Sequence, residues 1–474
     1  MLLRMKAINQ KYLLSLGLAT TLGFSVIAKT PVESKSKLSK RPNIVFIMAD
    51  DLGWKDLACF GSSYYETPNI DRLAKSGVRF TQAYSDNPLC SPTRCSILSG
   101  MNPARFGVLQ ACCHVGEPKL QATVSKSAPS YSPLLSVVSA NRLDTAYYTI
   151  AEALRDAGYH TAHFGKWHTG AGAYEATNQG FELDIPHTPN APGPGGGYLG
   201  PWKFIADNDG YKGKPGEHIE DWMSGQAANL IGKWAKEDRP FYLQYWAYSV
   251  HAPISARADY TKSFAAKANP ENPQHNPVYA AMVKSLDDAV GRIMNSIDDA
   301  GIRENTIVLF YSDNGGLVQQ ANSTHPEGYT ESLITSNVPL RSGKASIYEG
   351  GSRVPCIWSW QGKFKAGTEN NAMMVGADIY PTMLELCGLK NSKHLDGISQ
   401  VPAMMQQKAV RDEILCHFPA LSYNPYSKVT GYTTHIRKGD YKLIRFWWFE
   451  EGKAHKYELY NISEDISEKI IWFS

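Results

Sequence analysis

Four continuous runs of apolar residues predict strands that are buried on both faces of a sheet. A strand with one exposed face would instead alternate between apolar and polar residues. The runs span residues 42–49, 160–164, 241–247 and 306–312. Between them, apolar residues recur with helical spacing at 68–76, 149–157, 223–236 and 278–300. Strands that alternate with helices predict an α/β fold, in which helices cover both faces of a largely parallel sheet.

Near residue 411 the pattern changes to short strands. We expect these strands at 413–417, 432–437, 441–447 and 457–459. The turn Lys438-Gly439-Asp440 lies between two of them, which is typical of an antiparallel hairpin. The sequence therefore predicts a large α/β domain over residues 42–405 and a smaller C-terminal α+β subdomain over 406–474, with its own antiparallel sheet.

The first residues have the pattern of a secretory signal peptide. Arg4, Lys6 and Lys11 precede or open an apolar run that is too short and too polar for a good membrane anchor. We expect a signal peptide over 1–28, a linker over 29–41, and export to the periplasm or the extracellular space. No later window is apolar enough to cross a bilayer.

Composition and charge exclude some classes of protein. The 474 residues are 43% hydrophobic and 20% charged, which is typical of a globular chain. Cleavage would remove three of the 48 basic residues and none of the 45 acidic ones, leaving 45 of each. A nucleic-acid binder with a strongly basic face is therefore not predicted. Tyrosine and tryptophan in the long irregular stretches are expected to contact sugar rings; these stretches are 110–144, 186–201, 268–277 and 318–337.

Polar residues follow each predicted strand of the sheet. Asp50-Asp51 and Asp313-Asn314 end two of the runs, His251 follows a third, and Lys166-Trp167-His168 follows the fourth. The carboxyl ends of parallel strands lie at one edge of a sheet, where ligands bind. Two oxygen-rich pairs at one edge need a cation to relieve their repulsion, and oxygen ligands favour Ca²⁺ or Mg²⁺.

The eight cysteines show neither a disulfide scaffold nor the spacing of a zinc site. Bridging the adjacent pair Cys112-Cys113 would be strained. Most of the cysteines are expected to be buried thiols, with Cys90 as the exception. They are Cys59, Cys90, Cys95, Cys112, Cys113, Cys356, Cys387 and Cys416.

The string from Cys90 to Gly100 admits three interpretations. A phosphatase loop of the C-x₅-R type is excluded, because Arg94 comes only four positions after Cys90 and the loop lacks glycines. A redox pair of Cys90 and Cys95 would have an unusual spacing that Pro92 stiffens. In the third interpretation the string resembles the type I sulfatase signature, in which the cysteine of Cys-x-Pro-x-Arg is oxidised to formylglycine. The resemblance is specific, because eleven consecutive positions match.

Other motifs resemble the same family in the same order along residues 41–460. They are Pro42-Asn43-Ile44, Asp50-Asp51-Leu52-Gly53-Trp54, Thr67-Pro68-Asn69-Ile70-Asp71, Gly165-Lys166-Trp167-His168, His251-Ala252-Pro253, Ser312-Asp313-Asn314-Gly315-Gly316, Gly343-Lys344 and Glu349-Gly350-Gly351-Ser352-Arg353. The resemblance implies an alkaline-phosphatase-like fold, with a large mixed sheet between helices and a smaller C-terminal antiparallel sheet.

The resemblance also implies the roles of individual residues. The implied ligands of one Ca²⁺ ion are Asp50, Asp51, Asp313, Asn314 and the modified Cys90. Arg94 and Lys166 would flank the formylglycine, and a maturation enzyme would have to form it. Lys344 and His251 would hold the sulfate, and His168 would be the partner of the formylglycine hydroxyl. His251, with a pKa near the operating range, would protonate the leaving alcohol.

The sequence thus predicts a sulfuric ester hydrolase that removes sulfate from a carbohydrate and releases inorganic sulfate. Three alternatives stay open: a sulfatase of small aryl sulfates, a phosphatase or phosphodiesterase of the same fold, and a glycan-binding relative without catalysis. The C-terminus departs from the family pattern. After Tyr457-Glu458-Leu459-Tyr460-Asn461, the chain ends in the apolar residues 470–474, from which we expect a truncated C-terminal subdomain.

Overall fold

The computed structural model describes most of the chain from residue 41 to residue 472. The positions within this range that it does not describe are 125, 128–133, 136, 189–190, 192, 195–196, 203–211, 321–331, 391–392, 407, 420–431 and 448–454. The expected signal peptide over 1–28, and all of the expected linker except residue 41, lie outside the described residues. Among the described helices, none is long and apolar enough to span a membrane.

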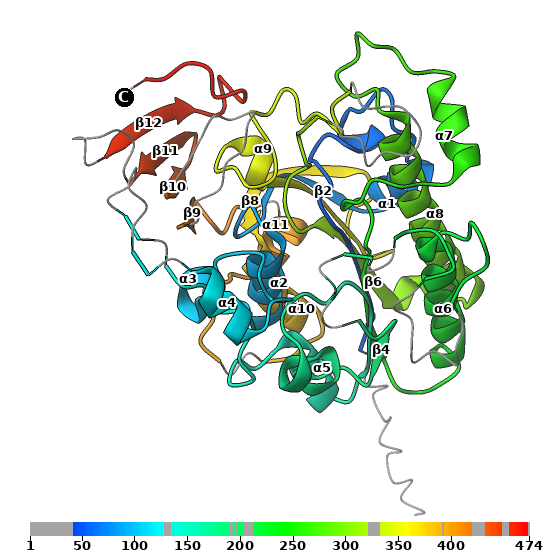
Figure 1. Ribbon diagram of the computed structural model, residues 1–474. Coiled ribbons are helices and arrows are strands. Elements are labelled where there is room, and N and C mark those ends of the chain that lie inside the picture. Colours follow the sequence, from blue (N-terminus) through cyan, green and yellow to red (C-terminus); the bar gives the residue numbers. More distant parts are fainter. Residues whose placement is uncertain are drawn as a thin grey trace, which may run out of the picture. The chain divides into compact units, whose positions relative to one another are not determined.

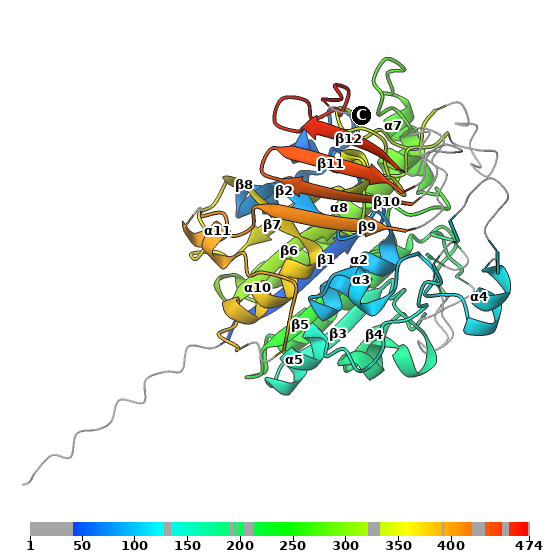
Figure 2. The same ribbon diagram turned by 90° about the vertical axis from the view of Figure 1, so that its left-hand side faces the viewer.

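Eight strands form the central sheet in the order β4-β3-β5-β1-β6-β7-β2-β8 (Figure 2). Their bounds are β1 (Asn43–Ala49), β2 (Val78–Tyr84), β3 (His160–Gly165), β4 (Leu183–Ile185), β5 (Phe241–Trp246), β6 (Thr306–Ser312), β7 (Arg353–Ser359) and β8 (Thr368–Val375). The neighbours from β4 to β6 pair in parallel. Strand β7 runs antiparallel to both β6 and β2, so the sheet is mixed. The four strands expected from the sequence are β1, β3, β5 and β6, and together with β4 they are consecutive parallel neighbours.

Helices cover both faces of this sheet (Figure 1). One layer contains α1 (Pro68–Lys75), α6 (Ile219–Trp234), α7 (Ala258–Ala265) and α8 (Pro277–Asp299). The other contains α2 (Cys90–Ser99), α5 (Ile150–Asp156), α10 (Ile379–Leu386) and α11 (Val401–Gln406). Strand β1 is buried on both sides: Val45 and Ile47 belong to the first core, while Phe46 and Met48 belong to the second. This two-sided burial explains the continuous apolar run and confirms the α/β prediction.

The C-terminal part of the chain forms a second sheet, as expected. It is antiparallel, in the order β12-β11-β10-β9. The strands are β9 (Glu413–Phe418), β10 (Thr433–Lys438), β11 (Tyr441–Phe446) and β12 (Lys456–Asn461). Gly439, in the left-handed region with φ 55°, makes the turn between β10 and β11. The apolar side chains of this second sheet pack with Ile347, Tyr348 and Leu89, and Leu89 directly precedes Cys90.

Buried charges join this second sheet to the part of the chain that forms the central sheet. Glu349 begins the short helix α9 (Glu349–Ser352) and accepts a hydrogen bond of 2.7 Å from the Tyr84 hydroxyl at the end of β2. Lys442 of β11 lies between two carboxylates, with Nζ 3.0 Å from Glu349 and 2.9 Å from Glu468. All three charged side chains are fully buried. Lys442 thus bridges two buried carboxylates, of which Glu349 also pairs with Arg353 at 3.4 Å and Arg437 at 3.9 Å.

We expect the Lys442→Met variant to be less stable by about 3–5 kcal/mol. It removes the paired cation of buried Glu468 and leaves Glu349 with only the more distant Arg353 and Arg437. Urea unfolding followed by tryptophan fluorescence measures the loss. Lys456→Met is the matched control: this lysine is 30% exposed and pairs with Glu458 at 2.8 Å. Its loss should stay under about 1 kcal/mol. Equal losses in the two variants would contradict the prediction.

Candidate active site at the carboxyl edge of the sheet

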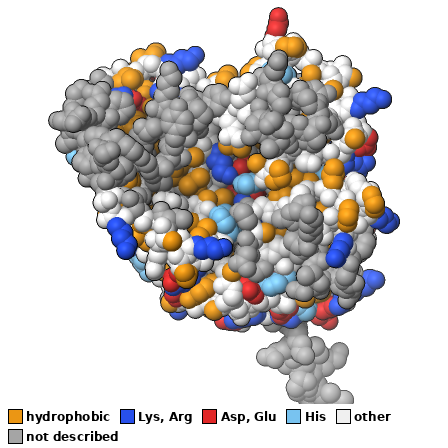
Figure 3. Space-filling view, in the orientation of Figure 1, with side chains coloured by type: hydrophobic (Ala, Val, Ile, Leu, Met, Phe, Trp, Pro, Cys, Tyr) orange, Lys and Arg blue, Asp and Glu red, His pale blue; other side chains and the backbone are white. Residues whose placement is uncertain are grey.

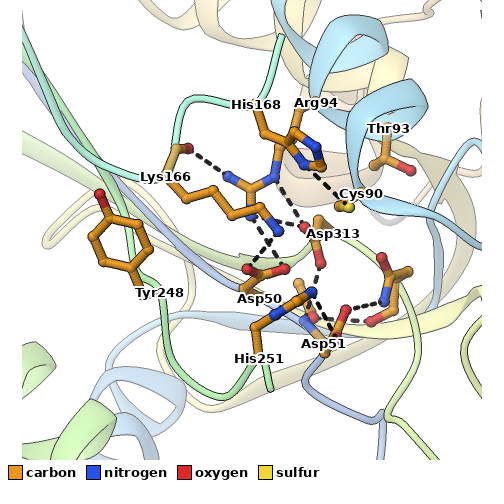
Figure 4. A network of polar contacts seen from close by, with 12 residues as sticks. Asp50, Asp51, Cys90, Thr93, Arg94, Lys166, His168, Tyr248, His251 and Asp313 are labelled. Carbon is orange, nitrogen blue, oxygen red and sulfur yellow. Dashed lines mark hydrogen bonds and ion pairs between the residues drawn. The ribbon is translucent and has the colours of Figure 1, made fainter. Parts of the chain in front are cut away.

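The predicted site residues meet at the edge of the sheet where the parallel strands end (Figure 4). Asp50 and Asp51 follow β1, Asp313 and Asn314 follow β6, Lys166 and His168 follow β3, and His251 lies in the segment after β5. Cys90 is the first residue of α2 and Arg94 lies one turn further on, while Lys344 comes from the segment before α9. Hydrogen bonds and ion pairs connect eight of these residues into one cluster. Cys90 and His168 contact each other beside it, within the electrostatic influence of Lys166.

Oxygen atoms from β1 and β6 point toward one another in this cluster. The Asp51 backbone N–H donates to Asp313 at 3.1 Å, and the Asn314 side-chain amide donates to Asp51 at 2.8 Å. Oδ1 of Asp50 and Oδ1 of Asn314 are buried and accept no hydrogen bond within the described chain. Buried oxygens without a donor are costly unless a cation takes that place. The donor set, which is all oxygen, fits a hard divalent ion.

Each carboxylate of the cluster has its shortest ion pair with a different basic side chain, while Arg94 also lies 3.6 Å from Asp50 and His251 lies 3.7 Å from Asp51. The pairs are Lys166 with Asp50 at 2.7 Å, Arg94 with Asp313 at 2.7 Å, and Lys344 with Asp51 at 2.7 Å. Three carboxylates therefore face three cationic groups. A divalent cation would give the site an excess of positive charge, which suits an anionic substrate.

The two neighbouring aspartates differ in their electrostatic surroundings. Burial raises the pKa of Asp50 well above its usual value, although Lys166 opposes this shift. Burial would also raise the pKa of Asp51, but Lys344 and His251 outweigh it and hold the pKa below its usual value. Asp51 has the left-handed φ of 62°, a conformation that aspartate tolerates better than most residues.

Cys90 lies at the amino end of a helix in which every residue is buried. Its side chain is 1% exposed, and Sγ lies 3.4 Å from Nδ1 of His168. Burial raises the pKa of the Cys90 thiol. Thr93 fixes the start of the helix, because its hydroxyl donates to the carbonyls of Asn87 at 2.9 Å and Leu89 at 3.1 Å. The unmodified thiol is therefore held rigidly, and burial disfavours its thiolate form.

Arg94 holds several parts of the site in place. Its Nη1 donates to the Lys166 carbonyl at 2.7 Å, while Nε and Nη2 donate to Asp313 at 3.0 and 2.7 Å. The guanidinium also lies over the Trp246 ring, 5.2 Å from the centroid. The spacing of four residues between Cys90 and Arg94 places both on one face of α2. Through Arg94, helix α2 thereby fixes Cys90 relative to the ends of β3 and β6.

His168 connects Cys90 to a residue that the sequence did not single out. Its Nε2 lies 2.9 Å from Nδ1 of His114, in the 110–144 stretch. Burial, together with Lys166, lowers the pKa of His168 well below its usual value, so the ring is neutral. If Nδ1 of His168 is to accept a proton on the Cys90 side, its Nε2–H must donate to His114. No local pattern could have revealed His114, because the contact joins positions 54 residues apart.

His251 has an environment that differs from the sequence-based expectation. Nδ1 lies 2.5 Å from the Ala252 carbonyl and so carries the proton, while Nε2 faces Asp51 at 3.7 Å. Burial, with Lys344 and Lys166 nearby, lowers the pKa of His251 to about 3. The expected pKa near neutrality was therefore wrong for this site, because a sequence gives no measure of burial. Nε2 of the neutral ring is free of a proton and can receive one.

The cluster opens to solvent on the side of Lys344 and His251. Their side chains are 13% and 20% exposed, whereas Asp50, Arg94 and Lys166 are fully buried. Figure 3 shows basic, acidic and histidine side chains together in a hollow near the middle of one face. A substrate would therefore contact Lys344 and His251 first, with Cys90 at the bottom of the site.

The chain matches models of known families over almost its whole described length. The model described as Sulfatase matches residues 42–389, and the model described as N-sulphoglucosamine sulphohydrolase, C-terminal, matches residues 343–471. A protein named Sulfatase from Formosa agariphila is 31% identical over 92% of this chain and 85% of its own. Human arylsulfatase A is 31% identical over 88% of this chain and 77% of its own.

A solved structure extends the similarity to three dimensions. The protein Ps i-CgsB, crystallised in complex with k-i-k-neocarrahexaose, superposes with a TM-score of 0.70. It is 27% identical and covers 91% of this chain and 88% of its own. The mixed sheet, the smaller second sheet and the cluster around Cys90 agree with these similarities. The chain belongs to the sulfatase family.

Proposed function

We propose that this sulfatase hydrolyses sulfate esters of a carbohydrate, with Cys90 as its reacting residue after oxidation to formylglycine. The observation that carries the proposal is the position of Cys90. It begins α2 within the cluster of paired carboxylates and cations, and its Sγ lies 3.4 Å from His168. Sulfatases generally depend on formylglycine and on a metal ion. The residues that we assign to such a centre lie around Cys90, which supports the proposal.

Asp50, Asp51, Asp313 and Asn314, together with the modified Cys90, would hold the metal ion. We assign Ca²⁺, because the buried donors are carboxylate and amide oxygens. When bound, the ion supplies charge that polarises a sulfate oxygen and lowers the pKa of a neighbouring hydroxyl. Formylglycine supplies a hydrated aldehyde, whose hydroxyl can attack sulfur and whose second hydroxyl allows the sulfate to be released.

The side chains around this centre bind the substrate and move protons. Lys344 and Lys166 place positive charge where the sulfuryl group gains negative charge during transfer. His168, which is neutral, can accept a proton from the hydroxyl at position 90, because its Nδ1 faces that position. His251 lies on the open side of the site with Nε2 3.7 Å from Asp51, and the negative charge of a bound ester would raise its pKa. It can then donate that proton to the leaving alcohol.

The alternatives differ in what they require of the site. A two-zinc phosphatase of this fold would want additional aspartate and histidine ligands and a serine or threonine nucleophile, whereas position 90 is a cysteine. A relative that only binds glycans would not need His168 against Cys90. Small aryl sulfates stay an alternative substrate class, since one similar protein is named arylsulfatase A. A carbohydrate is favoured because the structure of Ps i-CgsB holds an oligosaccharide.

We also propose that the chain is exported and matured by another enzyme. The N-terminal pattern over 1–28 supports export, and bacterial proteins with similar sequences include sulfatases. A formylglycine-generating partner is needed because the chain carries a cysteine at position 90, which has to be oxidised to become formylglycine. Residues 42–405 would form the catalytic part and 406–474 the smaller subdomain.

The proposal is tested by protein coexpressed with a formylglycine-generating enzyme. Mass spectrometry of the tryptic peptide that contains Cys90 should show the conversion of thiol to aldehyde. The same sample should release inorganic sulfate from at least one of a panel of sulfated polysaccharides: carrageenan, chondroitin sulfate, heparin, fucoidan and ulvan. Conversion with release only from 4-nitrophenyl sulfate would favour the aryl alternative. Failure of conversion with an active maturation enzyme would contradict the mechanism.

Ca²⁺ is expected to stabilise the protein even when Cys90 is unmodified. At a hundredfold excess over Kd, binding to the folded state contributes about 2.7 kcal/mol. For a chain of this size, the midpoint of thermal unfolding should rise by about 3 °C. Differential scanning fluorimetry with Ca²⁺, and with EDTA as the reference, measures the shift. The shift should be absent in Asp51→Asn, and an equal shift in that variant would contradict the assignment of the ligands.

A further inference from the structure

A second cavity lies beside the catalytic cluster, on the side of His168. It has a volume of about 310 Å³ and is lined by the 110–144 segment and by the loop after β3. We call it the Arg142 pocket; its polar lining residues are His114, Glu117, Asn141, Arg142 and Tyr174. His114 lines the pocket and also contacts the catalytic cluster, because its Nδ1 lies 2.9 Å from Nε2 of His168. The pocket therefore begins one side chain away from the catalytic cluster.

Hydrogen bonds fix the pocket to the loop that carries Lys166 and His168. The Leu143 N–H donates to the Thr169 carbonyl at 2.8 Å, and the Trp167 indole N–H donates to the Tyr174 carbonyl at 3.0 Å. Gly170 has a φ of 135°, and a Cβ there would lie 2.7 Å from Cβ of Tyr174. The walls of the pocket thus have a set position relative to the catalytic loop.

The polar groups of the pocket carry no net charge. Arg142 forms an ion pair with Glu117 and donates to Oδ1 of Asn141 at 2.9 Å. Its guanidinium lies 4.9 Å from the centroid of the Tyr174 ring. Burial, with Lys166 nearby, lowers the pKa of His114, so this ring is neutral near pH 7. The pocket offers hydrogen-bond donors and acceptors, but it has no unbalanced cation for a second anionic group.

We propose that the Arg142 pocket binds the uncharged sugar unit next to the sulfated one, an inference that rests on the proposed function. Adjacent ring hydroxyls can donate to the Glu117 carboxylate and accept from the Arg142 guanidinium, which is 31% exposed. A uronate or a second sulfate would instead meet the negative charge of Glu117. A neighbouring cavity of about 660 Å³ shares Glu117, Asn141 and Arg142, which leaves room for a longer glycan.

Binding without turnover tests the proposal. All proteins carry Cys90→Ala, and isothermal titration calorimetry gives Kd for two probes. The probes are built on the sulfated unit of the panel polysaccharide that wild-type protein desulfates fastest: the sulfated monosaccharide, and a synthetic trisaccharide in which uncharged sugars flank that unit. The double substitution Glu117→Ala and Arg142→Ala should weaken trisaccharide binding by roughly tenfold to a hundredfold, because hydrogen bonds to charged groups are lost. Monosaccharide binding should change less than about twofold.

A closely similar pair of residues provides the control. Arg79 and Glu369 form an ion pair with side-chain exposures of 27% and 59%, compared with 31% and 53% for Arg142 and Glu117. Arg79 also lies over an aromatic ring, that of Phe60, at 5.2 Å. Arg79 lies at the start of β2 and Glu369 at the start of the neighbouring parallel strand β8, away from the carboxyl ends of the strands. Arg79→Ala with Glu369→Ala should leave binding of both probes unchanged.

Two results would overturn the proposal. Equal affinities of the unaltered and doubly substituted proteins for the trisaccharide would show that the pocket binds no sugar. Tighter binding of a trisaccharide with flanking uronates than of the uncharged trisaccharide would show that the pocket receives an anionic group instead of an uncharged one. Failure of the proposed function itself is a separate outcome, since wild-type protein would then release sulfate from none of the polysaccharides.

Discussion

Cys90→Ala is expected to abolish sulfate release while leaving the fold intact. Removing the nucleophile of a hydrolase lowers kcat on the order of 10⁶-fold. Alanine cannot be oxidised to an aldehyde, so His168 would face a methyl group where a hydroxyl is needed. Cys90 is the first residue of α2, and alanine is compatible with that position. Ion chromatography of released sulfate, at matched concentrations of folded protein, measures the loss.

Cys95→Ala controls for the loss of a buried thiol. Cys95 lies in the same helix and is fully buried, but it packs in the hydrophobic core away from the paired carboxylates. The variant should retain activity within about threefold and lose roughly 1 kcal/mol of stability, the typical cost of a small substitution. Comparable loss of activity in the two variants would contradict the assignment of Cys90 as the reacting residue.

His251→Asn is expected to have the second largest effect, and its size should depend on the leaving group. General acid catalysis contributes about 10²–10⁴-fold, so hydrolysis of a sugar sulfate should fall by that factor. The alcohol of a sugar leaves as a strongly basic alkoxide unless it is protonated. The weakly basic 4-nitrophenolate needs no proton, so the loss with 4-nitrophenyl sulfate should be under about tenfold. Values of kcat for both substrates test the difference.

An equal loss with both substrates would mean that His251 holds the sulfate and donates no proton. Asparagine is the informative replacement, because its amide can still donate to the Ala252 carbonyl that now lies 2.5 Å from Nδ1. Lys344→Ala provides a contrast. Because Lys344 contacts Asp51 and would bind the sulfuryl group, its loss should affect both substrates alike.

The parts of the fold that could be predicted are those with a strong local pattern. Strands β1 and β6 are buried on both faces, so each is a continuous apolar run that ends in an oxygen-rich pair. The sequence pattern did not predict strand β2, because the polar residues Arg79, Thr81 and Gln82 interrupt its apolar run where the strand is partly exposed. The stretch 110–144, expected to be irregular, contains the short helix α4 (Glu117–Thr123).

The site residues divide in the same way. Site residues within motifs could be predicted from the sequence. Several of these motifs follow a parallel strand, and the ends of parallel strands meet at one edge of the sheet. Properties that depend on distant neighbours could not be predicted. The partner of His168 lies 54 residues away in the chain, and the lowered pKa of His251 follows from burial and from Lys344, which lies far along the sequence. Contacts between distant residues and shifts of pKa can be described only from a three-dimensional structure, which gives the positions of the surrounding side chains.

The network around Glu349 has a consequence for the modularity of the protein. Glu349 lies five residues after Lys344, and it contacts both Tyr84 at the end of β2 and Lys442 in the C-terminal sheet. The two matching family models overlap over residues 343–389, the segment that contains Lys344 and Glu349. A cut on either side of this segment would separate charges that neutralise one another. The C-terminal sheet therefore belongs to the scaffold of the active site, and exchanging it between relatives would also change the support of Lys344.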